Sequence, residues 1–114
     1  MITLYGIANC DTIKKAKQWL EQSGLDYEFH DYKKAGCNED LARQFIAQFD
    51  LDTVINKRGT TWRKLPEQEK NALTPESAVA LMASQPSIIK RPIVKAGKLW
   101  LIGFNEQSWQ SKLA

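Results

Sequence analysis

The sequence has few of the residues that define a disulfide-rich, metal-binding or membrane protein. Its 114 residues include two cysteines and one histidine, and no apolar run comes near the roughly 18 residues that span a bilayer. Two cysteines form no disulfide framework, and Cys10, His30 and Cys37 lack the spacing of known metal ligands, so we expect no metal site. We also expect no signal peptide, because residues 1–5 include no basic region and no small-residue cleavage site. These absences predict a cytoplasmic protein in which a free thiol persists.

An excess of one charge is also missing. The net charge is +3, and charged residues make up 25% of the chain. A mild balance of this kind gives no reason to expect nucleic acid or a membrane as a partner. A chain of this length is long enough for one domain with its own core, so we expect a single domain and a monomer.

The first third of the chain reads as strand, helix, strand. Residues 2–7 form a nearly continuous apolar run, typical of a buried strand, and residues 27–32 alternate as a half-exposed strand does. Between them the spacing predicts a helix that ends before Gly24. The apolar face of this helix consists of Ile13, Ala16 and Leu20. This order predicts two parallel strands joined by a right-handed crossover.

The middle of the chain changes character. Asn38 is positioned to cap a helix whose apolar stripe is Leu41, Phe45 and Phe49. Residues 51–65 are polar and basic, and we interpret them as irregular. Thr74 followed by Pro75 predicts a second helix start, with Ala78, Leu81 and Met82 as its buried stripe.

The last segment returns to strands. Residues 92–94 and 99–102 flank Ala96-Gly97 and predict an antiparallel hairpin. Asn105 then caps a closing helix that directs Trp109 and Leu113 inward. The whole order is therefore α/β with a helical insert in the middle.

Cys10 follows the first strand and opens the first helix. The unpaired N–H groups of a first helical turn attract an anion, so a thiolate there has a lowered pKa. Lys14 and Lys15 add positive charge one turn later, whereas the Asp11 carboxylate opposes it. The alternative interpretation is a cysteine packed as a small hydrophobic residue at the end of a strand.

Arg91-Pro92 stands immediately before the predicted hairpin. An extended arginine at this place suits a clamp for an anion or a peptide. The alternative is a solvated arginine before a proline that begins an edge strand.

Four segments together resemble a known family. They are ITLYGIANCDTIKKAKQWL, YEFHDYKK, NKRGTTWRKL, and IIKRPIV followed by GF. In this order they resemble the arsenate reductase (ArsC) family over nearly all of the chain, within its Spx/YffB branch and closest to YffB-like proteins. The resemblance implies a thioredoxin-like (glutaredoxin-like) fold with a small mixed four-stranded sheet. It also implies a helical insertion at roughly 36–87 and a cis proline at Pro92 facing Cys10.

The resemblance further implies which residues carry function. Cys10 corresponds to the nucleophilic cysteine of the glutathione-coupled arsenate reductases. Lys14 replaces a family arginine, and a further oxyanion arginine corresponds to Arg58 or Arg63. The residues implied to bind substrate or glutathione are Thr12, Lys14, Arg58, Arg63, Arg91 and Pro92.

The function that we favour is that of a glutathione-dependent thiol oxidoreductase with a single thiolate. Ile13 stands where Spx-type regulators often carry a second cysteine, so oxidation of Cys10 leads to a mixed disulfide with a small thiol. Glutathione is then the co-substrate, no cofactor is bound, and a protein disulfide or glutaredoxin is a further partner. One alternative is an Spx-like regulator that binds RNA polymerase or another protein. Another is a true arsenate reductase, although Gly103–Glu106 stands where those enzymes carry an arginine.

Two other residues invite a chemical interpretation. Cys37 follows the second strand and would resolve a Cys10 adduct if the two approached closely. We favour an incidental surface thiol instead. His30 shares the polar face of its strand, and we interpret it as a surface histidine rather than a catalytic base.

Overall fold

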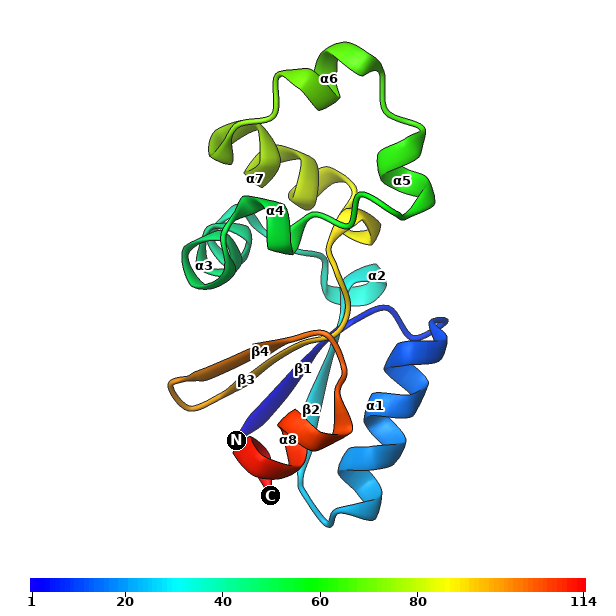
Figure 1. The fold of residues 1–114 in the computed structure, drawn as a ribbon, viewed down its shortest axis with the longest axis vertical. Coiled ribbons are helices and arrows are strands. Elements are labelled where there is room, and N and C mark those ends of the chain that lie inside the picture. The colour runs from blue at the N-terminus through cyan, green and yellow to red at the C-terminus, as the bar shows by residue number, and fades with distance from the viewer. The chain divides into compact units, whose positions relative to one another are not determined.

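The computed structural model describes residues 1–114, and its chain divides into two compact units (Figure 1). The first, here called the sheet unit, combines Met1–Ala35 with Arg91–Ala114. The second, the helical unit, is the continuous segment Gly36–Lys90, which contains the residues predicted as a helical insertion.

The sheet unit contains one mixed four-stranded sheet, as the sequence predicts. Its strands are β1 (Ile2–Gly6), β2 (Tyr27–Asp31), β3 (Ile93–Ala96) and β4 (Leu99–Ile102), in the order β2-β1-β3-β4. β1 runs parallel to β2 and antiparallel to β3, and β3 and β4 form the predicted hairpin. Gly97 in the hairpin turn has φ 62°, a conformation that glycine adopts without steric cost.

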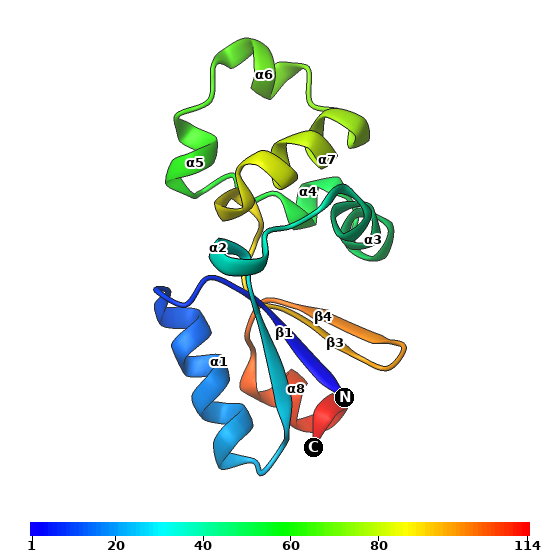
Figure 2. The ribbon, with the colours of Figure 1, turned by 180° about the vertical axis from the view of Figure 1, so that it is seen from behind.

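Two helices pack on the sheet to form the core of this unit, and both are visible in Figure 2. α1 (Asp11–Gln22) buries the predicted stripe of Ile13, Ala16 and Leu20. α8 (Glu106–Leu113) begins at Asn105, whose side chain accepts the Ser108 N–H at 2.9 Å. The core cluster consists of Leu4, Ala16, Leu20, Val94, Leu101 and Trp109.

The second strand ends one residue earlier than predicted. Tyr32 begins the short helix α2 (Tyr32–Ala35) and is buried. His30 is half-buried, and its interpretation as a surface histidine rather than a catalytic base stays a prediction. Its half-buried ring lies 5.2 Å from that of Tyr5 and 5.7 Å from that of Tyr32, measured between ring centroids. Alternation along the strand places Tyr32 on the same face as His30, whereas the contact with Tyr5 depends on the pairing of β1 with β2.

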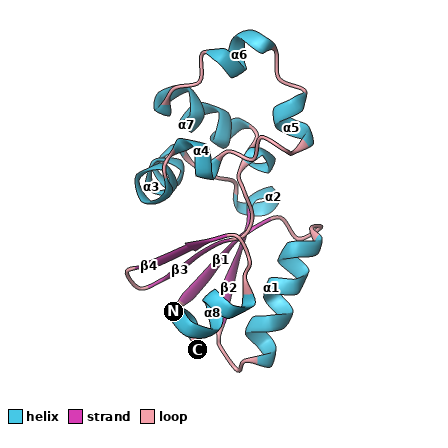
Figure 3. Ribbon diagram, in the orientation of Figure 1, coloured by secondary structure: helices cyan, strands magenta, loops and turns pink.

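The helical unit consists almost entirely of helices and loops (Figure 3). The Asn38 side chain caps α3 by accepting the Leu41 N–H at 2.8 Å, and Thr74 and Ser77 form a capping box at the start of α7. Both predicted helix starts are therefore confirmed. The helices are α3 (Glu39–Phe49), α4 (Leu51–Val54), α5 (Thr60–Arg63), α6 (Glu67–Asn71), α7 (Pro75–Ser84) and the 3₁₀ helix η1 (Pro86–Ile88).

The prediction of an irregular segment at 51–65 is wrong, because α4 and α5 lie within it. α4 begins where the Asp50 side chain accepts the Thr53 N–H at 2.9 Å. A helix of one turn is too short to produce an apolar period, so the sequence pattern missed it.

The buried faces of the two longer helices in this unit also differ from the prediction. α3 buries Ala42 and Phe45, and α7 buries Val79 where Leu81 was expected. Leu41, Phe49 and Leu81 are half-buried. No helix in the chain is both long enough and apolar enough to cross a membrane.

Candidate active site at Cys10

Cys10 is the N-cap residue of α1. Its backbone is extended, with φ −148° and ψ 127°, and its carbonyl accepts the Lys14 N–H at 3.0 Å. This arrangement places the side chain beside the first turn of the helix, where the N–H groups have no partner within the helix. The prediction that Cys10 opens the first helix is confirmed, and its side chain is partly accessible.

The surroundings of the sulfur favour the thiolate. Burial opposes ionisation, but the Ile13 N–H, the hydrogen bond and charge of the Arg91 side chain, and the Thr12 N–H together outweigh burial. They hold the pKa of Cys10 below its ordinary value. Hydrogen bonds and a positive charge act in the same direction because both stabilise the negative sulfur more than the neutral thiol.

Arg91 reaches this place because of the strand order. β3 lies beside β1, and the register pairs Tyr5 with Ile93. The segment that leads into β3 therefore meets the end of the strand that leads to Cys10. The Arg91–Pro92 peptide bond is cis, as the resemblance implies, and Pro92 is buried.

Gly103 ties Pro92 to the last helix of the sheet unit. Its N–H donates to the Pro92 carbonyl at 2.8 Å, and its own carbonyl accepts the Trp109 Nε1–H at 3.2 Å. Its φ of 78° lies in the left-handed region, which favours glycine. The structural role of Gly103 is not predicted from the sequence, where the segment is noted only for its missing arginine; a glycine directly after a strand is the signal that indicates it.

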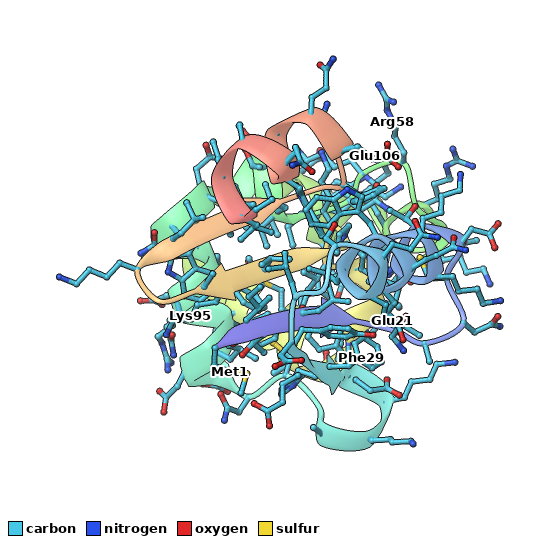
Figure 4. All side chains as sticks on the ribbon, turned by 90° about the horizontal axis from the view of Figure 1, so that it is seen from below. Met1, Glu21, Phe29, Arg58, Lys95 and Glu106 are labelled. Atoms are coloured by element: carbon cyan, nitrogen blue, oxygen red, sulfur yellow. The ribbon has the colours of Figure 1, made fainter.

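The remaining predicted residues fall in two places. Thr12 is half-buried in the first turn of α1, and Lys14 is exposed on the same helix. Arg58 and Arg63 belong to the helical unit and are exposed, and the Arg58 side chain points away from the ribbon in Figure 4. The backbone N–H of Arg58 donates to Asn56 Oδ1 at 3.2 Å. Ligand roles for these residues stay predictions.

Cys37 has the opposite environment to Cys10. It is buried, with 3% of its surface exposed, so its interpretation as a surface thiol is wrong. Burial raises the pKa of the Cys37 thiol to about 11, and its Sγ–H donates weakly to the Asn38 carbonyl at 3.8 Å. Such a thiol is almost wholly protonated at neutral pH and is a poor nucleophile.

Comparison with known proteins agrees with the fold. A family model described as the ArsC family matches residues 5–111. An uncharacterised protein of Haemophilus influenzae is 46% identical over 114 residues, covering all of both chains. The global transcriptional regulator Spx of Streptococcus agalactiae is 30% identical over 93% of this chain and 78% of its own length.

Solved structures of similar sequence have the same fold. The YFFB protein is 43% identical and superposes with a TM-score of 0.96, covering all of both chains. An arsenate reductase (ArsC) related protein from Brucella melitensis is 41% identical, with a TM-score of 0.79, and the match covers 97% of this chain and 92% of that one.

Proposed function

The chain belongs to the ArsC family and has a thioredoxin-like fold, and on this basis we propose that it is a glutathione-dependent thiol oxidoreductase acting through the Cys10 thiolate. The observation that carries the proposal is the lowered pKa of Cys10 at the start of α1. A partly accessible thiolate with this stabilisation is the form of cysteine that attacks disulfides.

The proposed reaction has two exchange steps. The Cys10 thiolate attacks the glutathione sulfur of a mixed disulfide, and the substrate leaves as a thiolate that takes up a proton. A second glutathione, as its thiolate, then attacks the glutathione sulfur bound to Cys10. This step forms oxidised glutathione and restores the Cys10 thiolate. Each cycle therefore consumes one reduced glutathione from solution, and the second half of the oxidised glutathione comes from the mixed disulfide of the substrate.

A second glutathione is required because this chain offers no suitable thiol of its own. Ile13 occupies the position where a Cys-x-x-Cys motif would place its second cysteine. Cys37 is buried, and its pKa of about 11 leaves little thiolate at neutral pH. Both features support resolution by a small thiol from solution.

In this proposal the sheet unit recognises glutathione near Cys10. Arg91 lies against the sulfur and supplies a positive charge, and the backbone flanking Pro92 pairs with the peptide of glutathione. Thr12 and Lys14 on α1 hold further polar groups of the ligand.

The test uses the full chain and a defined substrate. We expect incubation with oxidised glutathione to add one glutathione to Cys10, detected by peptide mass spectrometry. We also expect turnover of a glutathionylated peptide in the presence of reduced glutathione. Cys10→Ser abolishes both, whereas Cys37→Ala leaves both unchanged. A wild-type protein that forms no adduct and shows no turnover refutes the proposal.

A second candidate function is protein binding, because Spx of Streptococcus agalactiae is described as a transcriptional regulator and covers 93% of this chain. A chain of this kind would bind RNA polymerase or another protein. If the Cys10→Ser variant and the wild type bind RNA polymerase with the same affinity, regulation rather than thiol exchange is the function.

Arsenate reduction is the third candidate, since the similar Brucella melitensis protein is described as related to arsenate reductase. Gly103 has a backbone φ of 78° and bonds to the Pro92 carbonyl, so this segment already serves a structural role where the reductases carry an arginine. We expect no turnover of arsenate with glutathione and glutaredoxin, and measurable turnover would favour this candidate.

A further inference from the structure

Gly6, the last residue of β1, has no conformational reason to be glycine. Four other glycines have a positive φ, namely Gly24, Gly36, Gly97 and Gly103, but Gly6 does not. It pairs with Asp31 in the parallel part of the sheet and is buried. An alanine can adopt this backbone conformation, so the reason for glycine has to be space.

The space beside Gly6 is filled by two residues of the candidate active site. A Cβ atom on Gly6 would lie 2.9 Å from Cγ1 of Ile13, and closer still to its Cδ1. The same Cβ would lie 3.9 Å from Cδ of Arg91, which is an ordinary contact. Carbon atoms pack at about 3.5 to 4.0 Å, so Ile13 occupies the volume that a side chain at position 6 would need.

Ile13 has little freedom to move aside. It is fully buried, with 0% of its surface exposed, and it lies in the first turn of α1. Isoleucine in a helix is held to one strongly preferred χ1 rotamer, which fixes Cγ1 relative to the backbone. Relief of the contact at Cγ1 therefore requires the turn itself to shift. That turn carries the Thr12 and Ile13 N–H groups that stabilise the Cys10 sulfur.

We propose that Gly6 is a positioning residue: its missing side chain lets Ile13 pack directly against the end of β1, and this contact holds the first turn of α1 in place beside Cys10. The purpose of this arrangement rests on the proposed thiolate chemistry. The arrangement itself does not, and its test needs no glutathione.

The test is a graded series at positions 6 and 13. Gly6→Ala is made in the wild-type chain, with Ile13→Val and with Ile13→Ala, and each Ile13 variant is also made alone. Valine removes Cδ1 but keeps a γ carbon, and alanine removes all atoms beyond Cβ. The readout is the pH midpoint of Cys10 alkylation by iodoacetamide, followed by peptide mass spectrometry so that Cys37 does not contribute. Far-UV circular dichroism identifies the folded variants.

We expect Gly6→Ala to raise the pH midpoint of Cys10 alkylation by about one pH unit, since a displaced first turn stabilises the thiolate less. The increase becomes smaller with Ile13→Val and vanishes with Ile13→Ala. This rescue separates positioning from general damage, which a second truncation would worsen. If Gly6→Ala alone does not fold, the series with Ile13→Val still decides the question.

The proposal is overturned if each folded Gly6→Ala variant has the same pH midpoint of Cys10 alkylation as the chain that keeps Gly6 and carries the same residue at position 13. It is also overturned if the increase is the same with Ile13→Ala as with Ile13. Either result leaves the proposed function intact, because glutathione addition and turnover are measured separately. Conversely, if the wild-type protein shows no turnover, the pH midpoints of Cys10 alkylation still test the role of Gly6.

Discussion

Cys10 and Cys37 carry the same side chain, but their surroundings shift the two pKa values in opposite directions. Cys10 lies at the start of α1, where Ile13, Arg91 and Thr12 overcome the effect of burial. Cys37 is buried before α3, and burial alone raises its pKa to about 11. Both precede a helix, so position in the chain does not distinguish them. The difference comes from whether donors and a positive charge face the sulfur.

The difference in reactivity should be the largest measurable effect. At pH 7.5 we expect iodoacetamide to modify Cys10 more than about 100-fold faster than Cys37, because the pKa of Cys10 is lowered and that of Cys37 is raised to about 11, so the thiolate fraction of Cys10 is much the larger. The Cys37 rate then rises about tenfold per pH unit until its pKa is reached. Peptide mass spectrometry gives both rates in one sample. In denaturant the alkylation rates of Cys10 and Cys37 should become equal. If their ratio is unchanged in the unfolded chain, the local sequence rather than the fold determines the difference.

The effect of pH on stability should have opposite signs at the two sites. An unfolded Cys37 ionises near 9.0 and the folded one near 11, so the folded state binds more protons between these values. The stability of wild type relative to Cys37→Ala should therefore fall by about 2 kcal/mol from pH 8 to 10.5. Urea unfolding of both proteins at each pH measures this difference and cancels the titration of other groups.

At Cys10 the sign reverses. The folded thiol ionises at a lower pH than the unfolded one, so the thiolate contribution is present above the unfolded pKa. It is lost as pH falls through the folded pKa. The stability of wild type relative to Cys10→Ala should therefore rise with pH up to about 9. A fall over this range contradicts the lowered pKa.

Removal of Arg91 should make Cys10 more like an ordinary thiol. We expect Arg91→Gln to raise the alkylation midpoint of Cys10 by about one pH unit, because a hydrogen bond and a charge on the sulfur are both weakened. Lys14→Gln removes the same charge from an exposed position on α1 and is the matched control. It should shift the midpoint by less than about 0.3 pH unit. Equal shifts would mean that overall charge rather than contact lowers the pKa.

A smaller effect is expected near Cys37. Asn38 caps α3 by accepting the Leu41 N–H at 2.8 Å. Asn38→Ala should cost about 1 kcal/mol, measured by urea unfolding, and should increase Cys37 alkylation by a fewfold as the start of α3 frays. Asn38→Asp keeps an acceptor and should retain most of the stability. If Asn38→Ala alters Cys10 alkylation instead, the two environments are not independent.

Much of this fold follows from signals that are local in the sequence. Asn38, Thr74 and Asn105 each mark a helix start, since a side-chain acceptor before an apolar period acts within three residues. The hairpin and the first buried stripe follow in the same way. The cis peptide bond before Pro92 was predicted only from the family resemblance, because the local sequence does not specify the isomer.

The missed features depend on distant or very short segments. The helices α4 and α5 are one turn each, so periodicity could not indicate them. The burial of Cys37 and the contact between the rings of His30 and Tyr5 depend on tertiary packing. The space beside Gly6 arises where β1, α1 and the segment before β3 converge, and no spacing in the sequence reports it.

The sheet unit is assembled from both ends of the chain, so the groups that activate Cys10 are not all synthesised at the same time. Ribosomes deliver a protein from its N-terminus, so Cys10 and the strands β1 and β2 emerge long before Arg91 and β3. Until β3 takes its place beside β1, the Arg91 guanidinium cannot reach the sulfur, and the nascent cysteine lacks this part of its activation. The thiol therefore reaches its full activation only after the last segment of the sheet unit has been made.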